Sequence, residues 1–110
     1  MPHIRMRGLP EDAVASLSGT LLTQLAELTG IHAQGFTLDW IPSTSYRDGK
    51  VDLSTTQVEV LWFPKDPNTH DKVEQAIREA VILAYPELQC LAVMFRALDP
   101  SRYYRDGKHF

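Results

Sequence analysis

The sequence predicts a single α+β domain, a two-layer sandwich in which two helices cover one face of a four-stranded sheet. Four stretches alternate between apolar and polar residues with a period of two, the pattern of strands with one buried face. Two longer stretches carry apolar residues at helical spacing, with Pro or Gly at their ends. The resulting order is β-α-β-β-α-β, and a chain of 110 residues has room for one such domain, spanning residues 1–110.

The first half of the chain contains a strand, a helix and a second strand. The first strand is predicted at residues 2–7, and the helix from residue 10 or 11 to residue 29. Pro10 suits the first turn of a helix, and the acidic pair after it suits the positive end of the helix dipole. Gly30 is typical of a C-terminal cap. The apolar stripe of this helix comprises Val14, Leu17, Leu21, Leu25 and Leu28. The second strand is predicted at residues 36–42.

The second half repeats the pattern of elements without repeating the residues. Residues 42–52 are polar and predict a long hairpin connection with room for a short strand. Asp66 and Pro67 then begin a helix as N-cap and first residue. Tyr85 ends this helix, because Pro86 disfavours helical geometry in the residue before it. The strands of this half are predicted at residues 57–63 and 91–98, and a polar, aromatic tail follows.

The sheet face turned away from the helices is mixed in character. Alternation places on it His3, Arg5, Arg7, Thr37, Asp39, Ile41, Gln57, Glu59, Leu61, Met94 and Arg96. Such a face is either solvated or part of an oligomer interface, where Arg–carboxylate pairs and scattered apolar groups are both common. The alternation does not choose between these two. Asp39 and Glu59 are expected on neighbouring strands, where ion pairs with the arginines are favoured over an acid–base role.

Composition and charge argue against several functions. A net charge of −3 argues against a nucleic-acid binder, which normally shows a basic face. The four histidines stand apart from possible metal ligands, and there is no phosphate-binding glycine loop, so neither a metal nor another cofactor is expected. No stretch approaches the roughly 18 apolar residues that cross a bilayer. The N-terminus does not resemble a signal peptide. The lone Cys90 is predicted to be a buried small hydrophobe, and His70 is predicted to be solvated. A cytoplasmic location is expected, because one thiol cannot form an internal disulfide.

Several features, taken in order, resemble the tautomerase superfamily. Met1-Pro2 leads directly into the first strand. The first helix ends in Leu28-Thr29-Gly30 and the next strand in Ile41-Pro42, which is similar to the macrophage migration inhibitory factor branch. The start Met1-Pro2-His3-Ile4, residues 91–95 and the tail from residue 99 to 110 look more like the 5-carboxymethyl-2-hydroxymuconate isomerase branch. The resemblance covers essentially the whole chain in element order and indicates a separate bacterial branch.

The resemblance implies a homotrimer whose three sheets form a barrel, with active sites between neighbouring subunits. It also implies that Met1 is removed and that Pro2 is a general base. This base would move a proton on a keto-enol or unsaturated keto-acid substrate. A secondary amine accepts such a proton only when it is neutral, and apolar burial or nearby cations lower its pKa.

The expected substrate-binding residues lie around Pro2 and are Arg96, Arg5, His3, Leu61 and Lys65. The arginines suit two-pronged contacts to a small carboxylate substrate, and Leu61 is expected to be an apolar wall, as are Met94 and Phe110. Lys65 lies where many relatives have a glycine turn, which predicts a different substrate. The alternative function is a non-catalytic trimeric binding or interaction protein that retains the fold.

Overall fold

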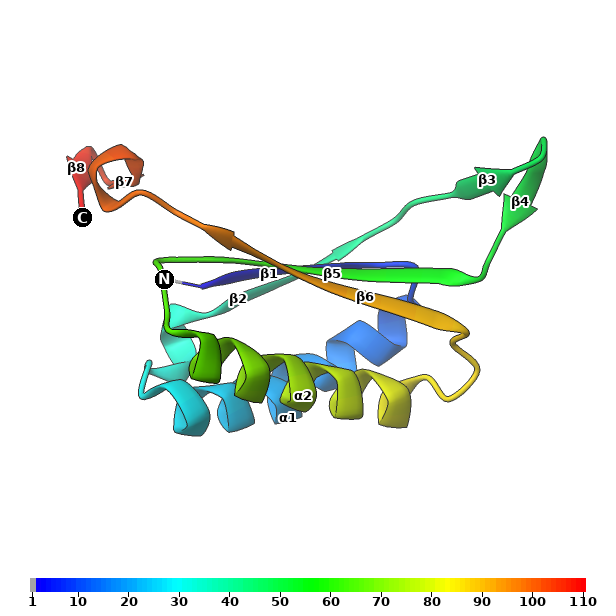
Figure 1. Cartoon of the computed structure of the whole chain (residues 1–110), viewed down its shortest axis with the longest axis horizontal. Coiled ribbons are helices and arrows are strands. Elements are labelled where there is room, and N and C mark those ends of the chain that lie inside the picture. The colour runs from blue at the N-terminus through cyan, green and yellow to red at the C-terminus, as the bar shows by residue number, and fades with distance from the viewer. Residues whose placement is uncertain (1) are drawn as a thin grey trace.

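The computed structural model describes residues 2–110 as two long helices, a central sheet and two small hairpins (Figure 1). The sheet consists of β1 (His3–Arg7), β2 (Thr37–Ile41), β5 (Thr55–Trp62) and β6 (Cys90–Ala97). The helices are α1 (Glu11–Thr29) and α2 (Pro67–Ala84). The hairpins are β3 (Ser45–Arg47) with β4 (Lys50–Asp52), and β7 (Tyr104–Arg105) with β8 (Lys108–His109). The predicted order and the α+β class are confirmed.

The central sheet has the strand order β2-β1-β5-β6 and mixed strand directions. β1 is parallel to β2 and antiparallel to β5, and β5 is parallel to β6. Both helices lie on one side of this sheet, as Figure 1 shows. The other side, called the open face below, has no helix over it. Within residues 2–110, no helix combines the length and apolar character needed to span a bilayer.

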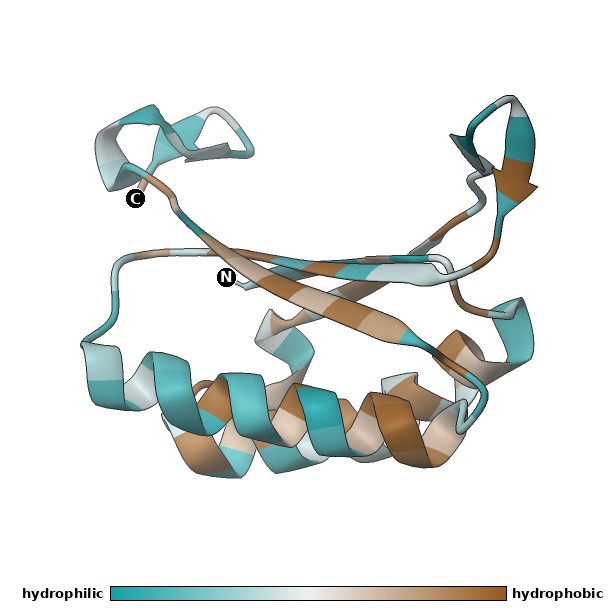
Figure 2. Cartoon of the chain, turned by 45° about the vertical axis from the view of Figure 1, so that its right-hand side comes forward, coloured by the Kyte–Doolittle hydropathy of each residue, from teal (hydrophilic) through white to brown (hydrophobic). Residues whose placement is uncertain are grey.

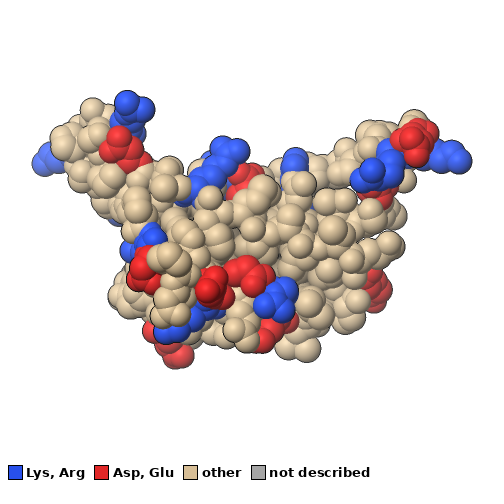
Figure 3. Space-filling view, in the orientation of Figure 1, with Lys and Arg blue, Asp and Glu red and all other residues tan. Residues whose placement is uncertain are grey.

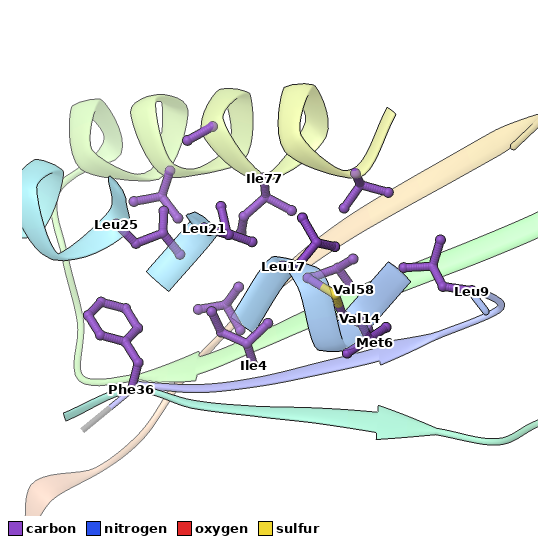
Figure 4. Close-up of a cluster of buried hydrophobic side chains, with 14 of the residues drawn as sticks. Ile4, Met6, Leu9, Val14, Leu17, Leu21, Leu25, Phe36, Val58 and Ile77 are labelled. Carbon is purple, nitrogen blue, oxygen red and sulfur yellow. The ribbon is translucent and has the colours of Figure 1, made fainter. Parts of the chain in front are cut away.

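The core lies between the helices and the sheet (Figure 4). Ile4 and Met6 of β1 are fully buried against helix side chains such as Leu21 and Leu25. Figure 2 shows hydrophobic and hydrophilic residues alternating along the helices and strands, as their periods require. Because β1 alternates, its charged residues Arg5 and Arg7 are exposed on the open face.

The sequence signals at the helix ends act as predicted. The Asp66 side chain accepts a hydrogen bond from the Thr69 backbone N–H at 2.8 Å, and Pro67 is the first residue of α2. Gly30 adopts the left-handed conformation after α1 (φ 74°), and its N–H donates to the Ala26 carbonyl at 2.9 Å. The Asp66 cap fixes where α2 begins, and the Gly30 cap fixes where α1 ends before the chain continues to β2.

Gly8, in the turn from β1 to α1, allows two backbones to approach closely. Its φ is +84°, and a Cβ at this position would overlap the carbonyl oxygen of Thr55. The Thr56 hydroxyl in turn donates a hydrogen bond to the Gly8 carbonyl at 3.1 Å. The turn therefore holds the C-terminal end of β1 against the start of β5.

The two hairpins form arms that extend beyond the open face at opposite ends of the sheet. Figure 1 shows the β3–β4 arm at one end and the β7–β8 arm at the other, and Figure 3 shows charged side chains of both signs at their tips. Both arms carry exposed hydrophobic side chains, including Val51 and Leu53 on the first and Tyr104 on the second. The open face thus lies between the two projecting arms.

Three expectations about single side chains are wrong. Cys90 is exposed rather than buried, because it begins β6 at the edge of the sheet. His70 is half-buried rather than solvated, with its ring stacked on Trp62 and Phe95 at centroid distances of 5.4 and 4.7 Å. Leu28, the last residue of the α1 stripe, is 41% exposed, because the helix ends one residue later.

Candidate functional site

Pro2 lies immediately before β1, and β1 begins at the end of the sheet from which the β7–β8 arm projects (Figure 1). Its side chain is fully buried, and its carbonyl accepts a hydrogen bond from the Thr37 backbone N–H at 3.0 Å. This contact joins the start of β1 to the start of β2, so Pro2 is held by the sheet itself. The predicted removal of Met1 concerns a residue outside the described range 2–110.

The strand register brings three of the predicted substrate-binding residues into one row on the open face. His3 of β1 pairs with Leu61 of β5, and Leu61 pairs with Arg96 of β6. Neighbouring strands are about 4.8 Å apart, so the His3 and Arg96 backbones are separated by about 10 Å. Lys65 is half-buried in the loop that follows β5, at the same end of the sheet. Four predicted residues therefore lie at the end of the sheet where β1 begins.

Arg5 belongs to the next row and is less close to Pro2. It pairs in register with Asp39 on one side and Glu59 on the other, so the two carboxylates flank β1. The expectation that Asp39 and Glu59 lie on neighbouring strands is therefore wrong. Glu59 instead forms an ion pair with Arg96, with 3.5 Å between Oε2 and Nε. In the described chain, this pair directs the Arg96 guanidinium toward the Arg5 row.

His3, the residue after Pro2, uses both of its ring nitrogens in hydrogen bonds. Its Nδ1 lies 2.7 Å from the Thr37 hydroxyl, and its Nε2 lies 2.6 Å from the Tyr103 hydroxyl. Burial is the main reason that the pKa of His3 is lowered, and the positive charge of Arg5 adds to this while Asp39 opposes it. The ring is therefore neutral at pH 7, with one nitrogen donating and the other accepting.

An aromatic cluster from the C-terminal segment completes this end of the molecule. Tyr103 stacks on His3 at a centroid distance of 5.7 Å and meets the edges of Phe63 and Phe110 at 5.5 and 5.1 Å. Phe63 and Phe110 also pack on each other at 5.4 Å. Phe110 was expected as an apolar wall, whereas Tyr103 was not predicted. The only sequence signal was the aromatic content of the tail, which does not say where the tail folds.

A cleft lies at the other end of the sheet. It encloses about 600 Å³ between the start of α1 and the β3–β4 arm, and its lining includes Leu9, Trp40, Asp52 and Tyr85. A second cleft beside it is lined by residues that include Pro10, Ala13 and Ala84. Pro2 lines neither of the two clefts. Among residues 2–110, no group of three or more histidine, cysteine or acidic side chains is placed to hold a metal ion.

Comparisons with known proteins agree with this geometry at the level of the fold. The family model described as "Domain of unknown function (DUF1904)" matches residues 1–109. A crystal structure of a DUF1904 domain from Sebaldella termitidis is 32% identical, with a TM-score of 0.92 and complete coverage of both chains. A comparison with the curated proteins finds no match.

More distant structures share the fold alone. A macrophage migration inhibitory factor-like protein from Entamoeba histolytica is 11% identical, with a TM-score of 0.79 over 99% of this chain and 98% of its own. A fused 4-OT, described as a symmetric trimer, is 13% identical, with a TM-score of 0.77 over 98% and 94% of the two chains. The chain therefore has the fold of the tautomerase superfamily.

Proposed function

This chain belongs to the DUF1904 family of domains of unknown function, and we propose that it is a small cytoplasmic tautomerase that works without a cofactor. Its substrate would be a keto-enol or unsaturated keto acid, and Pro2 would be the general base. The observation that carries the proposal is the position of Pro2. It is fully buried at the end of β1, beside a row that contains His3, Leu61 and Arg96.

The burial of Pro2 suits the chemistry of a basic amine. Once Met1 is removed, the Pro2 nitrogen is a secondary amine, and burial and nearby cations both favour its neutral form. The neutral amine takes a proton from carbon beside a carbonyl, and the C–H electron pair becomes the double bond of an enolate. The protonated amine then returns that proton to oxygen or to another carbon. The proton is conserved and no cofactor enters the step.

Arg96 is the proposed anchor for the substrate carboxylate. A guanidinium binds a carboxylate by two parallel hydrogen bonds, which fixes both position and orientation. The Arg96 side chain is 70% exposed, so a substrate carboxylate could reach its guanidinium by exchanging with the Glu59 carboxylate. Arg5 and Lys65 would add positive charge around the same substrate, and Leu61 would contact its apolar part.

We propose that the site is completed by neighbouring copies in a homotrimer. Within one chain, neither cleft includes Pro2, so the space for a substrate beside it would have to be formed together with residues of neighbouring copies. The fused 4-OT structure is described as a trimer, which supports the same arrangement for this fold. The open face and the two projecting arms would supply the contacts between copies.

The test begins with the N-terminus of untagged protein. Intact mass spectrometry is expected to show loss of Met1, and the processed protein is expected to accelerate ketonisation of phenylenolpyruvate. Pro2→Ala should lower this rate about 10²-fold or more, since general-base catalysis typically contributes that much. The matched control is the same chain with one extra N-terminal residue, which keeps the Pro2 ring but converts its amine into an amide. Equal rates for the three proteins would disprove the proposal.

The complete enclosure of Pro2 favours one alternative function. A non-catalytic trimeric binding or interaction protein would keep the fold while leaving Pro2 as a core residue. It would form a trimer in light scattering and show no turnover of enol substrates. Retention of Met1 in the native protein would favour this alternative over the tautomerase.

A further inference from the structure

We propose that Tyr103 is a further catalytic residue, whose hydroxyl donates a hydrogen bond to the substrate oxygen that becomes negative when Pro2 removes a proton from carbon. His3 is the positioning residue that aims this hydroxyl. The inference rests on the proposed function, because it assigns a second group to the same site.

A chain of hydrogen bonds runs from Thr37 through His3 and ends at Tyr103. The Thr37 hydroxyl lies 2.7 Å from Nδ1 of His3, and the Tyr103 hydroxyl lies 2.6 Å from Nε2. Both ring nitrogens are therefore used, which fixes the plane of the imidazole and the position of the phenol oxygen. His3 directly follows Pro2, so the phenol oxygen is tied by one hydrogen bond to the residue next to the proposed base.

The protons shared by Thr37, His3 and Tyr103 leave one O–H for the substrate. Burial lowers the pKa of His3, so its ring carries one N–H at pH 7. If the Thr37 hydroxyl donates to Nδ1, the Nε2–H donates to the phenol oxygen of Tyr103. Within residues 2–110, the phenol O–H is then left without an acceptor and is available for a substrate oxygen. A phenol that accepts one hydrogen bond is also a stronger donor in the next.

The Tyr103 ring is fixed although it lies in the C-terminal segment. It packs on His3, Phe63 and Phe110, so three rings constrain its position. The backbone turns back here as well, because the Phe110 N–H donates to the Tyr103 carbonyl at 3.0 Å. A donor that is already in place needs no reorganisation when charge develops on the substrate.

In the proposed step, Tyr103 keeps its own proton. Pro2 nitrogen takes the proton from carbon, the C–H pair forms the carbon–carbon double bond, and the carbonyl π pair moves to oxygen. The Tyr103 O–H stabilises this oxyanion by a hydrogen bond until the protonated amine returns the proton. The reaction needs no oxidant, reductant or further reactant, and Tyr103 ends unchanged.

The test compares Tyr103→Phe with Tyr85→Phe in the full chain after removal of Met1. Tyr103→Phe keeps the ring contacts and removes only the hydroxyl, so kcat for phenylenolpyruvate should fall about 10²-fold with little change in KM. Tyr85 follows α2 and lines the cleft at the other end of the sheet, so its variant should match wild type. A kcat for Tyr103→Phe within twofold of wild type would overturn the proposal.

A second pair of variants tests the positioning role of His3. His3→Ala leaves the phenol without its partner and should lower kcat, whereas the amide of Gln in His3→Gln still bonds Tyr103 and should recover part of the loss. His3→Ala in the Tyr103→Phe background should cost little more, because the two residues act through one hydrogen bond. Additive losses would show that His3 acts independently of Tyr103 and would overturn its assigned role.

The same measurements separate this inference from the proposed function. If wild type turns over and Pro2→Ala does not, the proline base stands, and the Tyr103 result alone decides the inference. If wild type shows no turnover that depends on Pro2, the proposed function fails and the Tyr103 role fails with it. Light scattering and thermal unfolding of every variant identify any loss of activity caused by misfolding.

Discussion

At the scale of single residues, His3 links parts of the chain that are far apart in sequence. Its two ring nitrogens reach the first residue of β2 and a tyrosine that lies 100 positions away. The sequence placed His3 on the open face next to Pro2, because alternation along one strand is a local property. It did not indicate Tyr103, because the contact depends on how a polar tail folds back, and no periodic pattern encodes that path.

The lowered pKa of His3 predicts how stability depends on pH. The pKa of this imidazole is lower in the folded state than in the unfolded state, where it has its ordinary value of 6.5. Between the lowered value and 6.5 the unfolded state binds more protons, so the free energy of unfolding rises with pH in this window and levels off above it.

The measurement is urea unfolding of wild type and His3→Gln at a series of pH values from 4 to 8 (roughly the range in which histidines titrate). The difference between the two proteins should shift in favour of wild type as the pH rises to 6.5. A difference that does not vary with pH would mean that His3 titrates alike in both states.

At the scale of elements, the predicted helices and central strands agree with the structure to within about two residues. The agreement is good because each element has its own hydrophobic period and its own residues that favour a start or an end, such as Asp66-Pro67 before α2. The arms were less predictable. The region of β3 and β4 was expected to be a hairpin connection, but its projection beyond the open face depends on how the chain leaves β2, which the sequence pattern does not specify.

The turn between β1 and α1 gives a prediction at this scale. Gly8→Ala should destabilise the chain by more than about 1 kcal/mol, since φ is positive and the new methyl group would overlap the Thr55 carbonyl. The matched control is Gly19→Ala within α1, where a Cβ meets nothing within 4 Å. That variant should stabilise the chain by about 0.5–1 kcal/mol, because alanine favours helix. Chemical denaturation of both variants checks the opposite signs.

At the scale of the whole molecule, the arms and the open face suggest how copies meet. The two edges of the central sheet, β2 and β6, have no further strand beside them within the described chain. Exposed edges of this kind are normally covered or paired. The arms lie on the side of the sheet away from the helices (Figure 1) and carry exposed hydrophobic side chains. A neighbouring copy that received an arm would bury these side chains and could also cover an exposed sheet edge.

Two leucines with nearly equal exposure test this arrangement. Leu53, beside the β3–β4 arm, is 82% exposed, and Leu83, on α2, is 83% exposed. Leu53→Asp should convert a trimer into smaller species in light scattering, because it introduces a charge into the proposed interface. Leu83→Asp should leave the trimer unchanged. Neither should unfold the single chain, which circular dichroism checks. Dissociation by Leu83→Asp alone would place the interface on the helices instead.

The exposed position of Cys90 affects how such experiments are carried out. An accessible thiol at a sheet edge is open to oxidation by air, and two molecules that meet there can become joined by a disulfide. A covalent dimer of this kind would appear in scattering data as an additional species that would have no counterpart in the reducing cytosol proposed for this protein. Storage under a reducing agent, or the use of Cys90→Ser, therefore keeps the measured mass a property of the native assembly.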